Sequence, residues 1–283
     1  MNGILKISFT LFTIIILAAN CQNNKSNDLS VNNDQESILS SITNDTLSVT
    51  EVSVNNEDSV GQYHLRIQFA NGKNEWLNYS INEYIMEALG GTYEGNLNNG
   101  DEMVKFYQEQ KSKEYQQFLN EYDVLLSSSM RYLYDAEIYK TADTDTYVTY
   151  QFNCETYMGG AHGSYIVMGQ TFRKYDGRRI SWSILTQPYD DSVQRLLRDG
   201  LKQYWQISND EELRDHLLNE DNYYNLPLPQ CPPLLDGRGI TFVYQQYEIA
   251  SYADGLPSFT IPYEKISPYL NITGQRLFCK LVE

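Results

Sequence analysis

Alternating apolar and polar residues predict several strands in this chain of 283 residues. Residues 47–54 and 63–69 both have the alternation that is typical of a strand with one buried face. Other segments are predicted as strands, most of them because they are rich in the Tyr, Val, Thr and Phe that pleated sheets favour. These segments are 129–139, 146–157, 164–175, 240–250, 258–261 and 274–282.

Helical spacing and capping residues predict helices between the strands. A capping box over Ser80–Glu83 indicates a short helix that ends at the Gly90–Gly91 pair. Apolar stripes indicate a helix over about 101–122 and another that begins at Asp190 or Asp191, followed by a short helix at about 209–219. Strands and helices do not alternate regularly. The sequence therefore predicts an α+β fold, with a mainly antiparallel sheet packed with several helices.

The first 21 residues have the pattern of an export signal. Lys6 precedes an apolar run at 11–17, and the small residues at 18–19 lead to Cys21. A Cys at this point is typical of a bacterial lipoprotein signal, so residues 1–20 are predicted as the signal peptide and Cys21 as the lipidated first mature residue. Ordinary cleaved secretion and a retained anchor are the alternatives.

A tether and one folded domain are expected after the signal. Residues 21–46 are mostly polar and too poor in apolar side chains to form a core, so we expect the lipidated N-terminus to continue as a flexible tether. The α+β domain is expected over 47–283, with an N-terminal part at about 47–150 and a C-terminal part at 151–283.

The charge of the chain limits its partners. A net charge of −16 argues against nucleic acid, whose phosphates need a basic surface. It also argues against a polybasic contact with anionic lipid, which leaves the N-terminal lipid as the membrane attachment. An acidic surface would steer a basic protein toward it, although acidity also serves solubility alone. We expect a membrane-anchored domain that faces the periplasm or the cell surface.

The cysteines suggest a structural role. Cys154 alternates with apolar strand residues and is expected to be a buried thiol, whereas Cys231 and Cys279 are candidates for a disulfide in an oxidising compartment. No Cys or His spacing typical of a metal site is present, so we expect neither a metal nor a cofactor.

Two stretches together resemble a known family. The first is Tyr157–Gly163, with the sequence YMGGAHG, followed by Asp176-Gly177; the second is Ile240–Gly255, followed by Phe259–Tyr263. The pattern resembles the extracytoplasmic domain shared by RsiV-type anti-sigma factors and the non-catalytic N-terminal part of PdaC-type peptidoglycan deacetylases, most strongly over 150–270. The resemblance implies a stand-alone lipoprotein form of a binding module, which in the anti-sigma factors recognises lysozyme. We expect neither sigma-factor regulation nor deacetylation.

The Gly-rich stretch holds the candidate binding residues, and no catalytic residue is predicted. Its glycines allow positive φ and close approach of a ligand, which we expect to be a cell-wall-active protein of lysozyme type or a glycan fragment. The candidates are Tyr157, Gly159, Gly160, His162 and Gly163. Alternatively, His162 only bonds a backbone carbonyl within a tight bend.

An envelope hydrolase with a site near His162 and a structural lipoprotein stay open as other functions. Pairing of His162 with a carboxylate in a deep pocket would favour the hydrolase. A shallow aromatic or acidic face would favour the binding module.

Overall fold

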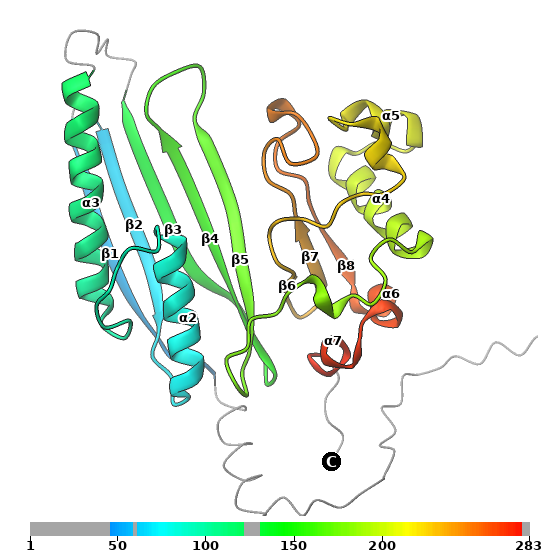
Figure 1. Cartoon of the computed structure of the whole chain (residues 1–283), viewed down its shortest axis with the longest axis horizontal. Helices are drawn as coiled ribbons and strands as arrows, with labels where there is room; N and C mark the ends of the chain where they lie inside the picture. Colours follow the sequence, from blue (N-terminus) through cyan, green and yellow to red (C-terminus); the bar gives the residue numbers. More distant parts are fainter. Residues whose placement is uncertain (1–45, 59–60, 122–130, 279–283) are drawn as a thin grey trace, which may run out of the picture.

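The computed structural model describes residues 46–58, 61–121 and 131–278. They form an α+β fold with two lobes (Figure 1). The predictions for the signal peptide, for Cys21 and for most of the tether lie outside these residues. None of the described helices is long and apolar enough to cross a membrane.

The first lobe is a five-stranded sheet with two helices on one face. Its strands follow the order β1-β2-β3-β4-β5. The elements are β1 (Val49–Glu57), β2 (Gly61–Ala70), α2 (Glu75–Ala88), α3 (Gly100–Glu121), β3 (Tyr132–Asp143), β4 (Tyr147–Tyr157) and β5 (Ser164–Arg173). Only β2 and β3 pair in parallel among these neighbours, because α2 and α3 form the crossover between them.

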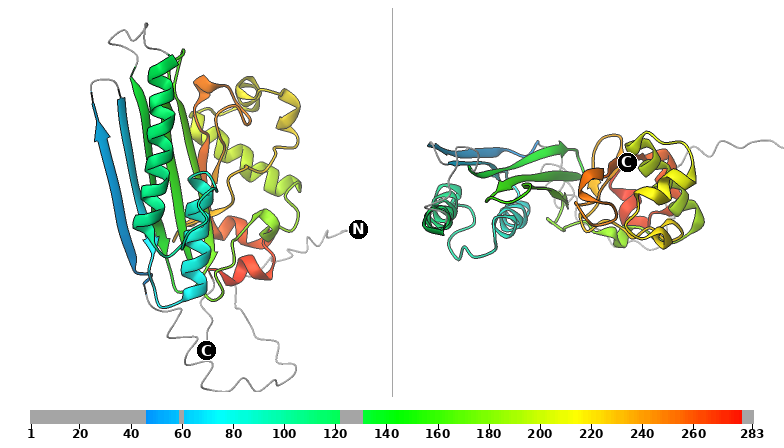
Figure 2. Two further views of the ribbon diagram at one scale, coloured as in Figure 1. Left: turned by 60° about the vertical axis from the view of Figure 1, so that its left-hand side comes forward. Right: turned by 90° about the horizontal axis from the view of Figure 1, so that it is seen from above.

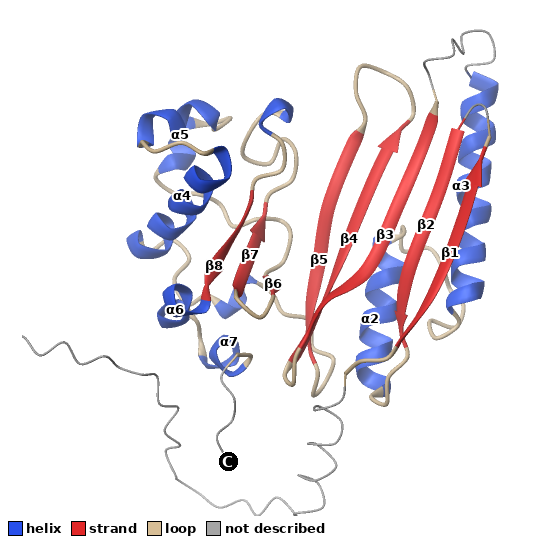
Figure 3. Ribbon diagram, turned by 180° about the vertical axis from the view of Figure 1, so that it is seen from behind, coloured by secondary structure: helices blue, strands red, loops and turns tan. Residues whose placement is uncertain are grey.

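Alternation along β2 separates the two faces of this sheet. Leu65 and Ile67 are fully buried against the helices, as the period of two requires. His64 and Arg66 point to the other face, where Arg66 forms an ion pair with Glu137 at 2.7 Å. Figure 2 shows α2 and α3 on the face of the sheet that carries Leu65 and Ile67. Figure 3 shows the opposite face, which the two helices leave uncovered.

The second lobe is a three-stranded antiparallel sheet packed with short helices. Its main elements are α4 (Asp191–Trp205), α5 (Asp210–His216), β6 (Leu234–Leu235), β7 (Gly239–Val243), β8 (Ser258–Pro262), α6 (Tyr263–Ile266) and α7 (Ile272–Arg276). Four 3₁₀ turns complete it, at Trp182–Ile184, Glu220–Tyr223, Tyr252–Asp254 and Ser267–Tyr269. Leu197 and Leu201 of α4 are fully buried in the core of this lobe, so the predicted apolar stripe packs inward.

Side chains of the second lobe form hydrogen bonds with the backbone of β5, the edge strand of the first sheet. The Gln245 side chain accepts a hydrogen bond from the Val167 amide at 3.2 Å and donates one to the Val167 carbonyl at 2.6 Å. The Tyr165 amide donates to the Gln246 side chain at 3.4 Å. These side-chain amides thus take the place of a further strand along β5. The edge of β5 is therefore where the two lobes contact each other.

The predicted α+β class is confirmed, and three predicted elements differ from the structure in extent or in type. The first helix begins at Glu75 rather than Ser80, because the Asn74 side chain accepts from the amides of Trp76 and Leu77. The strand predicted over 240–250 ends at Val243, where the chain enters a turn. The strand predicted over 274–282 is wrong in its described part, since α7 occupies 272–276.

Candidate functional site

The predicted Gly-rich bend forms the tip of the hairpin between β4 and β5. Gly159 and Gly160 have φ of 88° and 100°, a region that side chains with a Cβ rarely adopt. Tyr157, the last residue of β4, donates its hydroxyl to the Gly160 carbonyl at 3.1 Å. At Gly163 a Cβ would lie 2.8 Å from the Thr156 carbonyl oxygen. The glycines are therefore required by the bend itself.

His162 is exposed and is held by a ring from the other lobe. Its Nδ1 lies 2.9 Å from the Gly163 carbonyl oxygen, and its ring stacks on Tyr252 with 4.0 Å between centroids. The Tyr252 hydroxyl donates to the same Gly163 carbonyl at 3.2 Å. Within the described part of the chain His162 has no carboxylate partner. The contact of His162 with the Gly163 carbonyl agrees with the alternative prediction, in which His162 only bonds a backbone carbonyl. This arrangement does not favour a hydrolase site centred on His162.

Further exposed side chains lie on the two segments that make this contact. Tyr247 is 57% exposed and its ring centroid lies 6.0 Å from that of Tyr252. Met158 and Tyr165 are also exposed large side chains, one at the hairpin tip and one at the start of β5. We call these five residues the aromatic tip: Met158, His162, Tyr165, Tyr247 and Tyr252. The sequence did not identify Tyr247, because its segment was predicted to be a strand.

Carboxylates lie beside the aromatic tip on the uncovered face of the sheet. Glu155 is the cross-strand neighbour of Tyr165, and Asp135 is the neighbour of Glu155 on the next strand. Burial raises the pKa of Tyr165, and the charges of Glu155, Glu137 and Asp135 contribute to the rise. Asp135 also contacts His64 Nδ1 at 2.9 Å. The surface next to the tip is thus acidic and polar.

A second histidine forms a hydrogen-bonded group within the other lobe. His216 Nδ1 lies 2.6 Å from Asp254, whose other oxygen accepts from the Ser251 hydroxyl at 2.5 Å. Burial raises the pKa of Asp254, but the hydrogen bonds from Ser251 and His216 outweigh it and lower the pKa below its usual value. Trp205 stacks on His216 with 4.6 Å between centroids. Ser251 bonds the carboxylate and not the imidazole, so this group lacks the Ser-His-Asp order of a nucleophilic relay.

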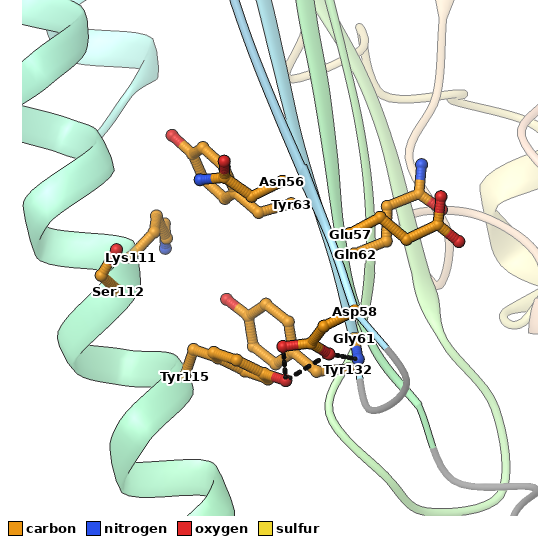
Figure 4. Close-up of a pocket in the computed structure, with 10 residues that line it drawn as sticks. All are labelled: Asn56, Glu57, Asp58, Gly61, Gln62, Tyr63, Lys111, Ser112, Tyr115 and Tyr132. Carbon is orange, nitrogen blue, oxygen red and sulfur yellow. Dashed lines mark hydrogen bonds between the residues drawn. The ribbon is translucent and has the colours of Figure 1, made fainter.

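A small pocket opens between α3 and the adjoining ends of β1 and β2 (Figure 4). Its volume is about 110 Å³. The Tyr115 hydroxyl lies 2.8 Å and 2.9 Å from the two carboxylate oxygens of Asp58, and the Gly61 amide donates to the same carboxylate. Burial, followed by this hydrogen bond, raises the pKa of Tyr115 to about 12. These contacts hold α3 to the end of the sheet, and the space suits water rather than a larger ligand.

The described cysteines are buried thiols. Burial raises the pKa of Cys154 to about 11 and that of Cys231 to about 12. Cys279 lies outside the described residues, so its disulfide with Cys231 stays a prediction. Within residues 46–58, 61–121 and 131–278, no group of three or more His, Cys, Asp or Glu residues could hold a metal ion.

Comparison with known protein families finds a match within the second lobe. The model of the family described as "Protein of unknown function (DUF3298)" matches residues 185–264, which run from the segment before α4 into α6. Tyr247 and Tyr252 of the aromatic tip lie inside this match, whereas the β4–β5 hairpin lies before it. No curated protein matches the chain.

Two solved structures extend the similarity over most of the chain. A DUF3298 family member from Bacteroides fragilis NCTC 9343 has 26% sequence identity and a TM-score of 0.65, with 80% of this chain and 94% of that chain covered. A DUF3298 family protein from Pseudomonas aeruginosa PAO1 has 14% identity and a TM-score of 0.55, with 81% and 97% covered. The second similarity concerns the fold alone. Residues 185–264 are therefore similar to the DUF3298 family, and most of the chain resembles these two structures in fold.

Proposed function

We propose that this protein is a lipid-anchored, non-catalytic binding module of the cell envelope. Its partner is a basic cell-wall-active protein of lysozyme type. The single observation that carries the proposal is the aromatic tip beside an acidic sheet face. The resemblance to the RsiV/PdaC extracytoplasmic domain, here in stand-alone lipoprotein form, supports the same class of partner. Cys21 would carry the lipid, and residues 21–46 would let the domain stand off a membrane on its periplasmic or cell-surface side.

The chemistry of the tip suits contact with a protein. Tyr and Met side chains supply a large contact area, and Tyr loses little conformational entropy when it is fixed. The neighbouring carboxylates and the net charge of −16 would attract a basic partner and speed its encounter. A cell-wall glycan fragment is the alternative ligand of the same tip, since exposed Tyr rings also stack on sugar rings. The contacts of His162 give no support to a hydrolase.

The test is calorimetric titration of the purified protein with lysozyme at low and at moderate salt. The informative variant is Tyr247→Asn, because Asn removes the ring and tolerates the φ of 63° at this position. Tyr189→Ser is the matched control, with a Tyr that is 60% exposed but lies in the loop before α4. Removal of a contact ring is expected to weaken binding about tenfold or more, with no change for the control.

The carboxylates are tested separately. Glu155→Gln removes one charge beside the tip, and Glu109→Gln removes another exposed charge on α3, which covers the other face of the sheet. We expect slower association for the first variant only. Absence of binding, or a signal that disappears at moderate salt and falls equally in both charge variants, would reject the proposal. Such a result would leave a glycan ligand or a structural role.

A further inference from the structure

A second concave surface lies at the other end of the five-stranded sheet. The residues beside Ala70, where β2 ends, form a groove with the first turn of α2 and the segment before α3. The strand register places this end far from the aromatic tip, since β1 and β2 run the full length of the sheet (Figure 2). The volume is about 730 Å³, within the range of about 300–1,000 Å³ that ligand sites occupy. We call it the Trp76 groove.

Two exposed aromatic rings border the Trp76 groove. Trp76 is 77% exposed and Tyr79 is 51% exposed. They are three positions apart on α2, so they lie on the same side of the helix. In the described part of the chain neither side chain makes a hydrogen bond or a ring contact. Such rings give little to the fold, whereas a flat ring at the edge of a polar groove is suited to stack on a ligand.

The wall of the groove is held in place by a buried amide. Asn82 is only 1% exposed; its side chain accepts from the Ala70 amide at 2.9 Å and donates to the Ala70 carbonyl at 3.2 Å. It also donates to the Asn98 side-chain oxygen at 3.2 Å, which leaves the Asn98 NH₂ group directed to other partners. Asn71 donates to the Thr50 hydroxyl at 2.9 Å, so its carbonyl oxygen can accept. The groove thus offers fixed donors and acceptors beside the two rings.

The charges at the groove define what it can accept. Glu75 and Asp101 both line it and both are exposed. Two carboxylates would repel a phosphate, sulfate or uronic acid, and no Lys or Arg is among the residues that line the groove. A ligand must therefore be uncharged or cationic, with flat apolar faces for the rings and many hydroxyl or amide groups for the asparagines.

We propose that the Trp76 groove binds a neutral saccharide chain. Sugar rings stack on Trp76 and Tyr79, and their hydroxyl or acetamido groups bond to Asn71 and Asn98. This site is separate from the aromatic tip and does not depend on the partner proposed there. A domain with both surfaces would contact a polysaccharide at one end and a protein at the other.

The experiment titrates the purified full-length protein with two neutral oligosaccharides, chitohexaose and cellohexaose, followed by calorimetry and tryptophan fluorescence. Fluorescence reports mainly on Trp76, because Trp182 packs against Phe242 and Trp205 against His216. Saturable binding of at least one neutral chain is expected, with a change in Trp76 emission. Polygalacturonate, an anionic chain, is expected not to bind.

Variants assign the binding to the groove. Trp76→Ala and Tyr79→Ala each remove an exposed ring and are expected to weaken binding about tenfold or more, while Tyr189→Ala leaves it unchanged. Circular dichroism confirms that each variant is folded. No binding of either neutral chain, binding that persists in both groove variants, or equal binding of polygalacturonate overturns the inference. Tyr247→Asn separates the two proposals, because it should weaken lysozyme binding and leave saccharide binding intact.

Discussion

Gly200 in the middle of α4 provides a quantitative test of how the second lobe is packed. In an exposed helix, Gly→Ala stabilises by about 1 kcal/mol, because Ala has the higher helix propensity. Here a Cβ would lie 2.5 Å from Cγ of Phe259 and closer still to two other carbons of the ring. Phe259 lies on β8, is buried, and stacks on Phe242 with 5.5 Å between centroids. The ring cannot move without disturbing the core of the lobe.

The two effects oppose each other, and their magnitudes decide the sign. Overpacking of a core by one methyl group costs about 1–3 kcal/mol. We place Gly200→Ala at the upper end, because three ring carbons would meet the new methyl group. After the helix-propensity gain of about 1 kcal/mol is subtracted, the free energy of unfolding should fall by about 2 kcal/mol. For a folded region of this size that corresponds to a decrease in Tm of about 4–8 °C.

The assay is urea unfolding followed by far-ultraviolet circular dichroism, with thermal unfolding as a second measure. Gly237→Ala is the matched control, since no atom lies within 4 Å of its Cβ position and the residue is exposed. Its free energy of unfolding should stay within about 0.5 kcal/mol of that of the unmodified protein. If Gly200→Ala were as stable as the unmodified protein, or more stable, the close packing of α4 on β8 would be refuted.

Two further predictions concern pH and thiol reactivity. The pKa of Asp254 is lowered in the folded state, so its contribution to stability is present above the ordinary carboxyl pKa of about 4 and is lost as pH falls through the lowered value. Asp254→Asn should therefore lower the free energy of unfolding at neutral pH and flatten its dependence on acid, measured by urea unfolding from pH 7 to 3. An unchanged pH profile would contradict the hydrogen bonds that the carboxylate accepts from Ser251 and His216. Cys154 and Cys231 should resist a maleimide at pH 7.5 in the folded protein, because both side chains are buried and burial raises the thiol pKa to about 11 for Cys154 and about 12 for Cys231. Peptide mass spectrometry should find them modified only after unfolding in guanidinium with a reductant. Rapid labelling of the folded protein would refute their burial.

Local patterns in the sequence predicted the elements that depend on local chemistry. Alternation or strand-favouring composition was sufficient for the first five strands, and apolar stripes were sufficient for α3 and α4. The Gly159–Gly160 pair indicated the hairpin bend correctly. The strand predicted beyond Val243 failed because Tyr247 adopts positive φ within a turn. That turn is held by the Glu248 carboxylate, which accepts from the amides of Gln245 and Gln230. Nothing in the apolar pattern of this segment distinguishes such a turn from a strand.

The contacts that make the candidate site were beyond the reach of the sequence because they join distant segments. His162 was selected for its glycine neighbours, but its stacking partner Tyr252 follows 90 residues later in the chain. Likewise, His216 and Asp254 meet only because α5 packs beside the turn that follows β7. Residue type could suggest that His162 bonds a backbone carbonyl; only the fold supplies the second ring.

The aromatic tip depends on both lobes, and this bears on how the domain would work. Met158, His162 and Tyr165 come from the β4–β5 hairpin, whereas Tyr247 and Tyr252 come from the segment between β7 and β8, inside the part that matches DUF3298. The side chains of residues 245 and 246, at the start of that segment, bond the edge of β5 and fix its position against the hairpin. A change in the angle between the lobes would therefore separate the stacked rings and divide the surface. The lobe junction is accordingly as necessary to the proposed binding surface as the rings themselves.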